Sequence, residues 1–295
     1  MLKALFEVVS KAGENMGEAS RSSILSLIDS DSGDTDMSMT ITHAKLFGAL
    51  VKVLPVADAN SLIKQRALTS RFSPASILNL NAVLLDSPLS LTANFALETP
   101  TIICQGVQHK TPFIADNAVL ATGKYLLHCG DDIAFETGKP IFEALAAVII
   151  PGNPVDLRRL ALVVVRTVSR QHNKIVRPHL PILAPAIFAC VRDMVIPVKL
   201  AAEAAFLTIF SVVEQEGAVF DKYMTGAGAD LAAGTKRSMQ DYFKRVALRL
   251  GGQARERQEA EGGQGGLGLS NDEKEDEKEI WSIGKMDLGD AFAND

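Results

Sequence analysis

Long apolar segments recur along this 295-residue chain, and a proline stands before each of the clearest ones. Three of these segments follow Pro112, Pro154 and Pro197, which lie 42 and 43 residues apart. Proline suits the first position of a helix, because its fixed φ is helical and the N–H that it lacks would have no partner there. The pattern therefore predicts a long helix after each of these prolines.

A second series of prolines interleaves with the first, at Pro100, Pro140 and Pro181, spaced 40 and 41 residues apart. Each of these also opens an apolar segment, so the repeating unit is two helices in about 40 residues. That period is typical of HEAT or armadillo solenoids, in which a helix packs on its partner and on both neighbouring repeats. We expect an all-α solenoid, in which Ser73 caps a helix that begins at Pro74.

The repeats predict where the parts of the chain begin and end. Second helices start near residues 2, 37, 74, 112, 154 and 197. Residues 1–215 then form about five repeats after a leading half repeat, as in a piece of a longer array. Residues 216–256 should hold capping helices, with a Gly-rich loop in "DKYMTGAGADLAAGTK" before a last helix near 236–250. Gly, Gln and charged residues dominate from 251 onward, so we expect a disordered acidic tail at 257–295.

An α/β fold is the main alternative, with "ALVVVRTV" and "AAVII" as buried parallel strands. Asn153-Pro154 and Thr111-Pro112 argue against it, because both pairs are typical of helix starts. The composition agrees with helices. Aromatic residues make up 6% of the chain, and the apolar 47% is mostly Ala, Leu, Val and Ile, a balance that favours packed helices over a β-sandwich.

Charge and cysteine content limit the kinds of partner. The net charge of −5 argues against nucleic-acid binding by the whole chain, but it leaves room for a local basic patch. Cys104, Cys129 and Cys190 share no metal-ligand spacing, so we interpret them as free thiols in a reducing compartment. No segment reaches the roughly 20 apolar residues of a membrane span, and residues 1–18 are interpreted as a packed helix, not a signal peptide. We expect a cytoplasmic protein without a membrane partner.

One short stretch, "LLHCGDD", gathers His128, Cys129, Asp131 and Asp132, residue types that serve as metal ligands or nucleophiles. Gly130 marks a helix end there, and no second cluster with suitable spacing accompanies it. The glycines of "TGAGAD" lack the Lys-Ser/Thr that follows a phosphate-binding loop. We therefore expect no enzyme activity, no cofactor, no metal and no small-molecule substrate.

The segment "KRSMQDYFKRVALRL" carries the most distinctive charge pattern. Its cations are Lys236, Arg237, Lys244, Arg245 and Arg249. On a helix, positions 237, 241, 244, 245 and 248 share a side, so a basic stripe could meet the phosphates of ribosomal RNA. The alternative is the solvated polar face that the end of a solenoid needs. Trp281, the only Trp, lies in "IWSIGKMDLGDAF", which is either a partner-binding motif, a segment that folds back on the solenoid, or an untethered tail.

Several stretches resemble one known family in wording as well as in helical pattern. They are "KAGENMGEASRSSIL", "ADNAVLATGKYLL", "PVKLAAEAAFLTIFSVVEQEGAVFDKY" and the tail "IWSIGKMDLGDAF". These are similar to the C-terminal end of the fungal general-control-nonderepressible family of HEAT-repeat translational activators, and the resemblance covers essentially the whole chain. Asp193 and Lys199 match the Asp and the basic residue that HEAT repeats carry six apart, at the turn and at the start of the second helix.

The resemblance implies a scaffold and not an enzyme. Family members lie along ribosomes and, with an ABC-type partner, promote activation of the kinase that phosphorylates the α subunit of initiation factor two in amino-acid starvation. The implied partners are the ribosome and proteins of that pathway. The kinase-binding arginine of the family falls upstream of this part, so no kinase-binding residue is carried over. The alternative is a HEAT-repeat adaptor of nuclear transport or a phosphatase scaffold, which would favour an inner stripe of acidic residues or a groove for a catalytic subunit.

Overall fold

The computed structural model describes residues 9, 11, 16–30, 37–69, 73–86, 95, 97–210 and 218–260, with side chains except at 27–30, 247 and 249–260. Every regular element in these residues is a helix. In chain order the elements are α2 (Glu18–Ser30), α3 (Met37–Val53), α4 (Val56–Arg66), α5 (Pro74–Asp86), α7 (Thr99–Val107), α8 (Pro112–His128), α9 (Asp131–Ile149), α10 (Val155–Gln171), α11 (Asn173–Val176), the 3-10 helix η2 (Arg177–His179), α12 (Leu180–Cys190), α13 (Ile196–Ile209), α14 (Ala218–Thr225), the 3-10 helix η3 (Ala227–Asp230) and α15 (Ala233–Ala260).

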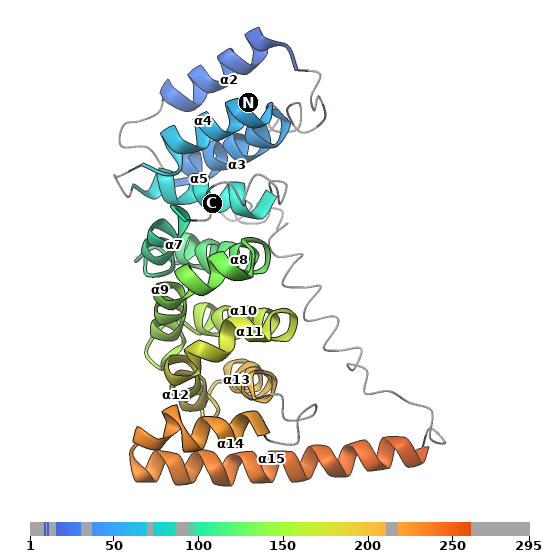
Figure 1. Ribbon diagram of the computed structural model, residues 1–295. Helices are drawn as coiled ribbons and strands as arrows, with labels where there is room; N and C mark the ends of the chain where they lie inside the picture. Colours follow the sequence, from blue (N-terminus) through green and yellow to red (C-terminus); the bar gives the residue numbers. More distant parts are fainter. Residues whose placement is uncertain are drawn as a thin grey trace.

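The long helices form two parallel stacks (Figure 1). Contacts run from α3 to α5, α8, α10 and α13 in one stack, and from α7 to α9 and α12 in the other. Each helix of the second stack also contacts the helix that follows it in the chain, which gives the pairs α7–α8, α9–α10 and α12–α13. This arrangement confirms the all-α solenoid of two-helix repeats. Helix α2 lies at one end of the stack, and α15 crosses the other end and extends beyond it.

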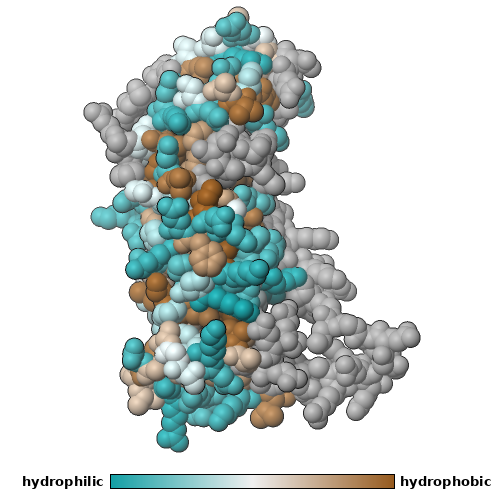
Figure 2. Space-filling model, in the orientation of Figure 1, coloured by the Kyte–Doolittle hydropathy of each residue, from teal (hydrophilic) through white to brown (hydrophobic). Residues whose placement is uncertain are grey.

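A single large hydrophobic cluster runs through the repeats from Val9 to Val246. Helix α10 shows why the segment "ALVVVRTV" is helical and not a strand. Ala161, Val165 and Val168 are fully buried, because α10 contacts α8, α9 and α13 and so has neighbours on several sides. The space-filling view of one face shows mainly hydrophilic residues, with hydrophobic ones scattered among them (Figure 2).

Most of the expected helix starts are confirmed. Pro112 is the first residue of α8, Pro154 is the cap of α10, and Pro197 is the second residue of α13. The predicted cap of α5 is also present. The Ser73 hydroxyl oxygen accepts from the Ser76 N–H at 3.1 Å, and the Ser76 hydroxyl oxygen accepts from the Ser73 N–H at 3.0 Å. This reciprocal pattern satisfies backbone donors that the first turn leaves without helical partners.

The helix start expected at Pro140 is wrong, because Pro140 lies inside α9. The helix begins instead at Asp131, just after Gly130, whose φ of 87° favours glycine. Pro140 leaves the carbonyl of Glu136 without its helical donor. Both residues are exposed, so water can bind that carbonyl, and the buried side of α9 keeps the helix intact.

The end of the solenoid is more helical than the glycines suggest. Part of the expected Gly-rich loop forms α14, because Phe220, Tyr223 and Met224 recur at helical spacing and are buried. The last helix was expected near 236–250 but runs from Ala233 to Ala260, past the expected tail boundary at 257. Its extension, "GGQARERQEA", contains Gln, Ala, Arg and Glu, whose helix propensity offsets the cost of two glycines, about 1 kcal/mol each.

Candidate functional site

Aromatic side chains fix α15 to the end of the solenoid. The ring of Tyr242 lies edge-on to Phe206 of α13, with centroids 5.3 Å apart, and edge-on to Phe188 of α12 at 5.9 Å. Phe243 stacks on Phe220 of α14 at 4.0 Å with nearly parallel planes. Such pairs add to the stability that burial of the rings provides. Helix α15 therefore has a defined orientation, and the opposite side of this helix faces solvent.

The basic stripe predicted on this helix is present in part. Arg237, Lys244 and Arg245 are exposed, and Lys236 is half-buried. Asp241 is exposed on the same side, so the stripe is mixed in charge. The backbone of Arg249 belongs to α15, but its side chain lies outside the described part of the chain. Trp281 lies wholly outside the described residues, so its expected role stays a prediction.

Arg245 also borders a hollow of about 420 Å³ between α15 and the last repeat. The hollow is lined by Val191, Arg192, Lys199, Glu203, Tyr242, Arg245 and Val246. It thus combines three cations with one carboxylate over a partly apolar floor. The guanidinium of Arg192 lies over the ring of Phe188, 5.9 Å from its centroid, in a cation–π contact.

This cationic hollow was not foreseen from the sequence. Arg192 follows α12, Lys199 lies on α13 and Arg245 lies on α15, so residues from three parts of the chain meet only in the folded protein. Chemically the hollow can hold a carboxylate or a phosphate, because guanidinium groups bind either one through two parallel hydrogen bonds. The only sequence signal was that each of these cations borders a strongly apolar segment.

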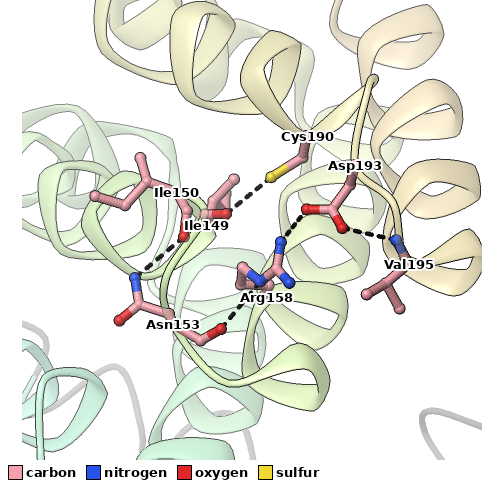
Figure 3. A network of polar contacts seen from close by, with 7 residues as sticks. All are labelled: Ile149, Ile150, Asn153, Arg158, Cys190, Asp193 and Val195. Atoms are coloured by element: carbon pink, nitrogen blue, oxygen red, sulfur yellow. Dashed lines mark hydrogen bonds and ion pairs between the residues drawn. The ribbon is translucent and has the colours of Figure 1, made fainter.

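A second arrangement of polar groups joins two consecutive repeats (Figure 3). Arg158, in the first turn of α10, donates from Nη1 to a carboxylate oxygen of Asp193 in the turn before α13, and both side chains are buried, at 7% and 8% exposed. The Nε–H of Arg158 donates to the carbonyl of Asn153 at 3.1 Å, and the Cys190 thiol donates to the carbonyl of Ile149 at 2.9 Å. We call Asn153, Arg158, Cys190 and Asp193 the repeat joint.

Asp193 and Lys199, the two residues six apart that match HEAT repeats, have different surroundings. Asp193 connects adjacent repeats through Arg158, whereas Lys199 is exposed and borders the hollow. The other oxygen of Asp193 accepts from the N–H of Val195 at 2.9 Å. This backbone hydrogen bond, followed by that of Arg158, holds the pKa of Asp193 below its usual range. Asp193 is therefore a charged structural residue.

The turn after α9 needs a special backbone conformation to reach this joint. Gly152 has a φ of 110°, in the region that only glycine adopts readily. The amide of Asn153 then donates back to the carbonyls of Ala147, at 2.9 Å, and Ile150, at 3.3 Å. These bonds satisfy acceptors at the end of α9, and they bring the carbonyl of Asn153 to Arg158.

The stretch "LLHCGDD" ends one helix and begins the next. Burial raises the pKa of the Cys129 thiol to about 11, so the thiolate that a nucleophile or a metal ligand requires is disfavoured. The Nδ1 atom of His172 lies 3.5 Å from a carboxylate oxygen of Asp131, a contact between the starts of neighbouring elements. In the residues that the structure describes, no three side chains of His, Cys, Asp or Glu group as a metal site would require.

None of the helices in the described ranges is both long enough and apolar enough to cross a bilayer.

Comparison with known proteins gives a consistent relationship. Residues 74–219 match a family model described as GCN1-like, C-terminal HEAT repeats. The chain is similar to the eIF-2-alpha kinase activator GCN1 of Saccharomyces cerevisiae, with 34% identity over 322 positions that cover 98% of this chain and 12% of that relative. It is also similar to Protein ILITYHIA of Arabidopsis thaliana, with 22% identity over 78% of this chain and 9% of that relative. The chain therefore spans a small part of the curated relatives that it matches.

Among solved structures, an engineered protein aligns with 71% of this chain and 89% of its own, at 10% identity and a TM-score of 0.49. A likeness of this size carries no argument about function.

Proposed function

Since the chain belongs to the family of GCN1-like C-terminal HEAT-repeat proteins, we propose that it is a non-catalytic scaffold of the translational response to amino-acid starvation. It would form the C-terminal HEAT-repeat part of a cytoplasmic activator of the kinase that phosphorylates initiation factor two α. The similarity to the yeast kinase activator over 98% of this chain carries the proposal. The kinase pathway and the ribosome are its proposed partners.

The architecture supports a scaffold role because the interior consists of packed hydrophobic side chains that stabilise the fold. The apolar sides of successive helices pack into one cluster, and the repeat joint fixes the turn of one repeat against the first turn of a helix in the preceding repeat. A solenoid of this kind holds distant surface groups at set positions, which lets it align two partners. Activation of a kinase by alignment requires no chemistry from the scaffold itself.

For the ribosome contact we propose the outward side of α15. Arg237 and Lys244 are exposed there, and Lys236 and Arg245 extend the basic surface along the helix. Lys and Arg side chains bind phosphates as charges without reading sequence. Asp241 on the same side lowers the local charge, so we expect a weak contact that depends strongly on salt.

The kinase role is tested in cells that carry the gene with codons 74–260 removed. If the proposal holds, starvation no longer raises phosphorylation of initiation factor two α in these cells, while cells with the intact gene respond. A normal response in the deleted strain, at equal protein abundance, would overturn the proposal.

The ribosome contact is tested by sedimentation of the chain with ribosomes at several salt concentrations. The variant Arg237→Glu/Lys244→Glu should leave the ribosome pellet at lower salt than the unchanged chain. A matched control is Lys64→Glu/Lys139→Glu, which reverses two exposed charges on α4 and α9. Equal losses in both variants, or no loss in either, would exclude α15 as the contact.

A further inference from the structure

The outward side of α13 and the turn before it form an exposed apolar ridge. Met194 is 98% exposed, Ile196 is 67% exposed and Leu200 is 58% exposed. Ile196 and Leu200 lie one turn apart on the same side of α13. Single exposed apolar residues are ordinary, but three large ones gathered on one turn and one helix face are typical of a surface that is covered by something else.

The cationic hollow lies directly beside this ridge. Lys199 and Glu203 are one turn apart on α13 and share the outward side of the helix with Leu200. Both border the hollow, across from Arg245 of α15. Arg192 comes two residues before Met194 in the chain and completes the cationic rim. The ridge and the hollow therefore form one continuous surface, which we call the α13 surface.

This surface fits a peptide better than it fits RNA. A nucleic-acid backbone would satisfy the three cations, but it would leave Met194, Ile196 and Leu200 against charged phosphates. A peptide that mixes large apolar and acidic side chains satisfies both parts, because its carboxylates reach the cations while its apolar groups cover the ridge. The chemistry of the occupant is thus acidic and apolar together.

We propose that residues 279–292 of this same chain, "EIWSIGKMDLGDAF", dock on the α13 surface. The segment contains large apolar residues, among them Trp281, Met286 and Phe292, interspersed with Glu279, Asp287 and Asp290. A tryptophan is the side chain that most often anchors such a contact, because it covers a large area at a small cost in conformational entropy.

Charge complementarity supports an occupant from this part of the chain. Residues 261–295 contain ten acidic and three basic residues, a net charge of −7, whereas the whole chain carries −5. The preceding 260 residues are therefore net positive by 2. The excess negative charge of the chain is confined to the region that contains the proposed occupant, and cations line the proposed receptor.

The connecting chain also has a suitable length. Helix α15 continues for 14 residues beyond Val246, which lines the hollow, and so leads about 21 Å away at about 1.5 Å per residue. Residues 261–278 then provide 18 residues of Gly-rich and charged composition. A linker of that length spans about 23 Å as a root-mean-square distance, close to the distance that it must return. Linkers matched in this way give effective concentrations on the order of 1 mM, so a dissociation constant of about 0.1 mM keeps the segment docked about nine-tenths of the time.

Trp281 reports on this contact in the full chain, because it is the only Trp. We expect its selectively excited emission to be shifted to the blue, and its fraction accessible to acrylamide to fall to about one tenth of that of the free 272–295 peptide. Leu200→Asp and Arg192→Glu/Arg245→Glu should each restore accessibility, because they remove contacts that the docked segment would use. The fold should tolerate both changes, since these residues are exposed and not part of the core. Val56→Asp changes an equally exposed residue on α4 and should leave the protection unchanged.

Each other outcome overturns the proposal. Trp281 as accessible as in the free peptide means that the segment does not dock. Protection that survives both α13-surface variants means that it docks elsewhere, and protection that grows with protein concentration means that a second copy supplies it. If Arg192→Glu/Arg245→Glu lowers ribosome sedimentation and leaves Trp281 protected, the hollow binds RNA instead. The fluorescence is measured without ribosomes or kinase, so a result that contradicts the docking proposal does not contradict the proposed scaffold function.

Discussion

The carboxylate of Asp193 accepts from the guanidinium of Arg158, 35 residues earlier in the chain, and this buried pair connects two consecutive repeats. The Asp193 carboxylate also accepts from the N–H of Val195, and the Arg158 guanidinium also donates to the carbonyl of Asn153. A buried charge with several hydrogen bonds is expensive to leave without its partner.

Asp193→Ala should lower the free energy of unfolding by about 2 kcal/mol, because it leaves the buried Arg158 without a counter-charge. Urea denaturation followed by circular dichroism measures the change. The control is Asp241→Ala, an exposed position on α15, for which we expect less than about 0.5 kcal/mol.

The double variant Arg158→Met/Asp193→Ala should be more stable than Asp193→Ala alone, since it removes both charges together. If the stability changes of Arg158→Met and Asp193→Ala, measured singly, add up to that of the double variant, the two residues do not interact in solution.

Asp116→Asn should stabilise the protein at neutral pH. Burial, and secondarily the charge of Asp156, raise the pKa of Asp116 to about 6, above the unfolded value of about 3.9. The folded state therefore binds this proton more tightly than the unfolded state. The stability that the protonated carboxyl contributes is present below about pH 4 and is lost as pH rises to about 6. Because the side chain is partly exposed, we expect a gain of only about 1 kcal/mol, or about 2 °C in Tm.

The same Asp116→Asn gain should shrink as pH falls through 6 and be absent below about pH 4, where both states are protonated. Thermal melts across that range provide the measurement, and a gain that is constant with pH would contradict the assigned pKa.

Gly106→Ala should destabilise the contact of α7 with α8 and α5. A Cβ at Gly106 would lie 2.8 Å from the Cβ of Ala118 and 2.9 Å from Cγ2 of Ile77, so at least one helix must shift, at a cost of about 1–3 kcal/mol. Gly234→Ala is the matched control, because nothing lies within 4 Å of that Cβ and alanine is the better helix former. The two changes should move the urea midpoint in opposite directions, and the same sign for both would refute the close packing.

The thiols should be unreactive in the folded protein. Burial raises the pKa of Cys104 and of Cys129 to about 11, which leaves little thiolate at pH 8. Iodoacetamide should label them at least about 100-fold more slowly than free cysteine, and urea should abolish the difference. Fast labelling of the native protein followed by peptide mapping would show that the helices around them open readily.

The sequence predicts the repeats well because their signals are local. Pro112, Pro154 and Pro197 mark helix starts through the backbone of a single residue, so neighbouring repeats do not matter. The helix start expected at Pro140 is wrong because contacts with other helices override the local signal there. The side chains that α9 buries hold the helix across the proline, and burial is set by contacts that the local pattern does not contain.

The candidate site was predictable only where it lies on one helix. The cations of α15 could be placed on one side by helical spacing, although Asp241 interrupts them. The hollow needs Arg192, Lys199 and Arg245 from three segments, and the partner of Asp193 is an arginine that resembles any surface charge in the sequence. Such pairings depend on how the repeats stack, which sequence spacing alone does not specify.

The order of contacts in the stack of α3, α5, α8, α10 and α13 has a mechanical consequence. Each helix packs against the next, so a force applied at α15 acts on every interface in series. The weakest interface then separates first. Such a protein can unfold from one end while the remaining repeats stay folded. A solenoid built in this way can stretch and recover one repeat at a time.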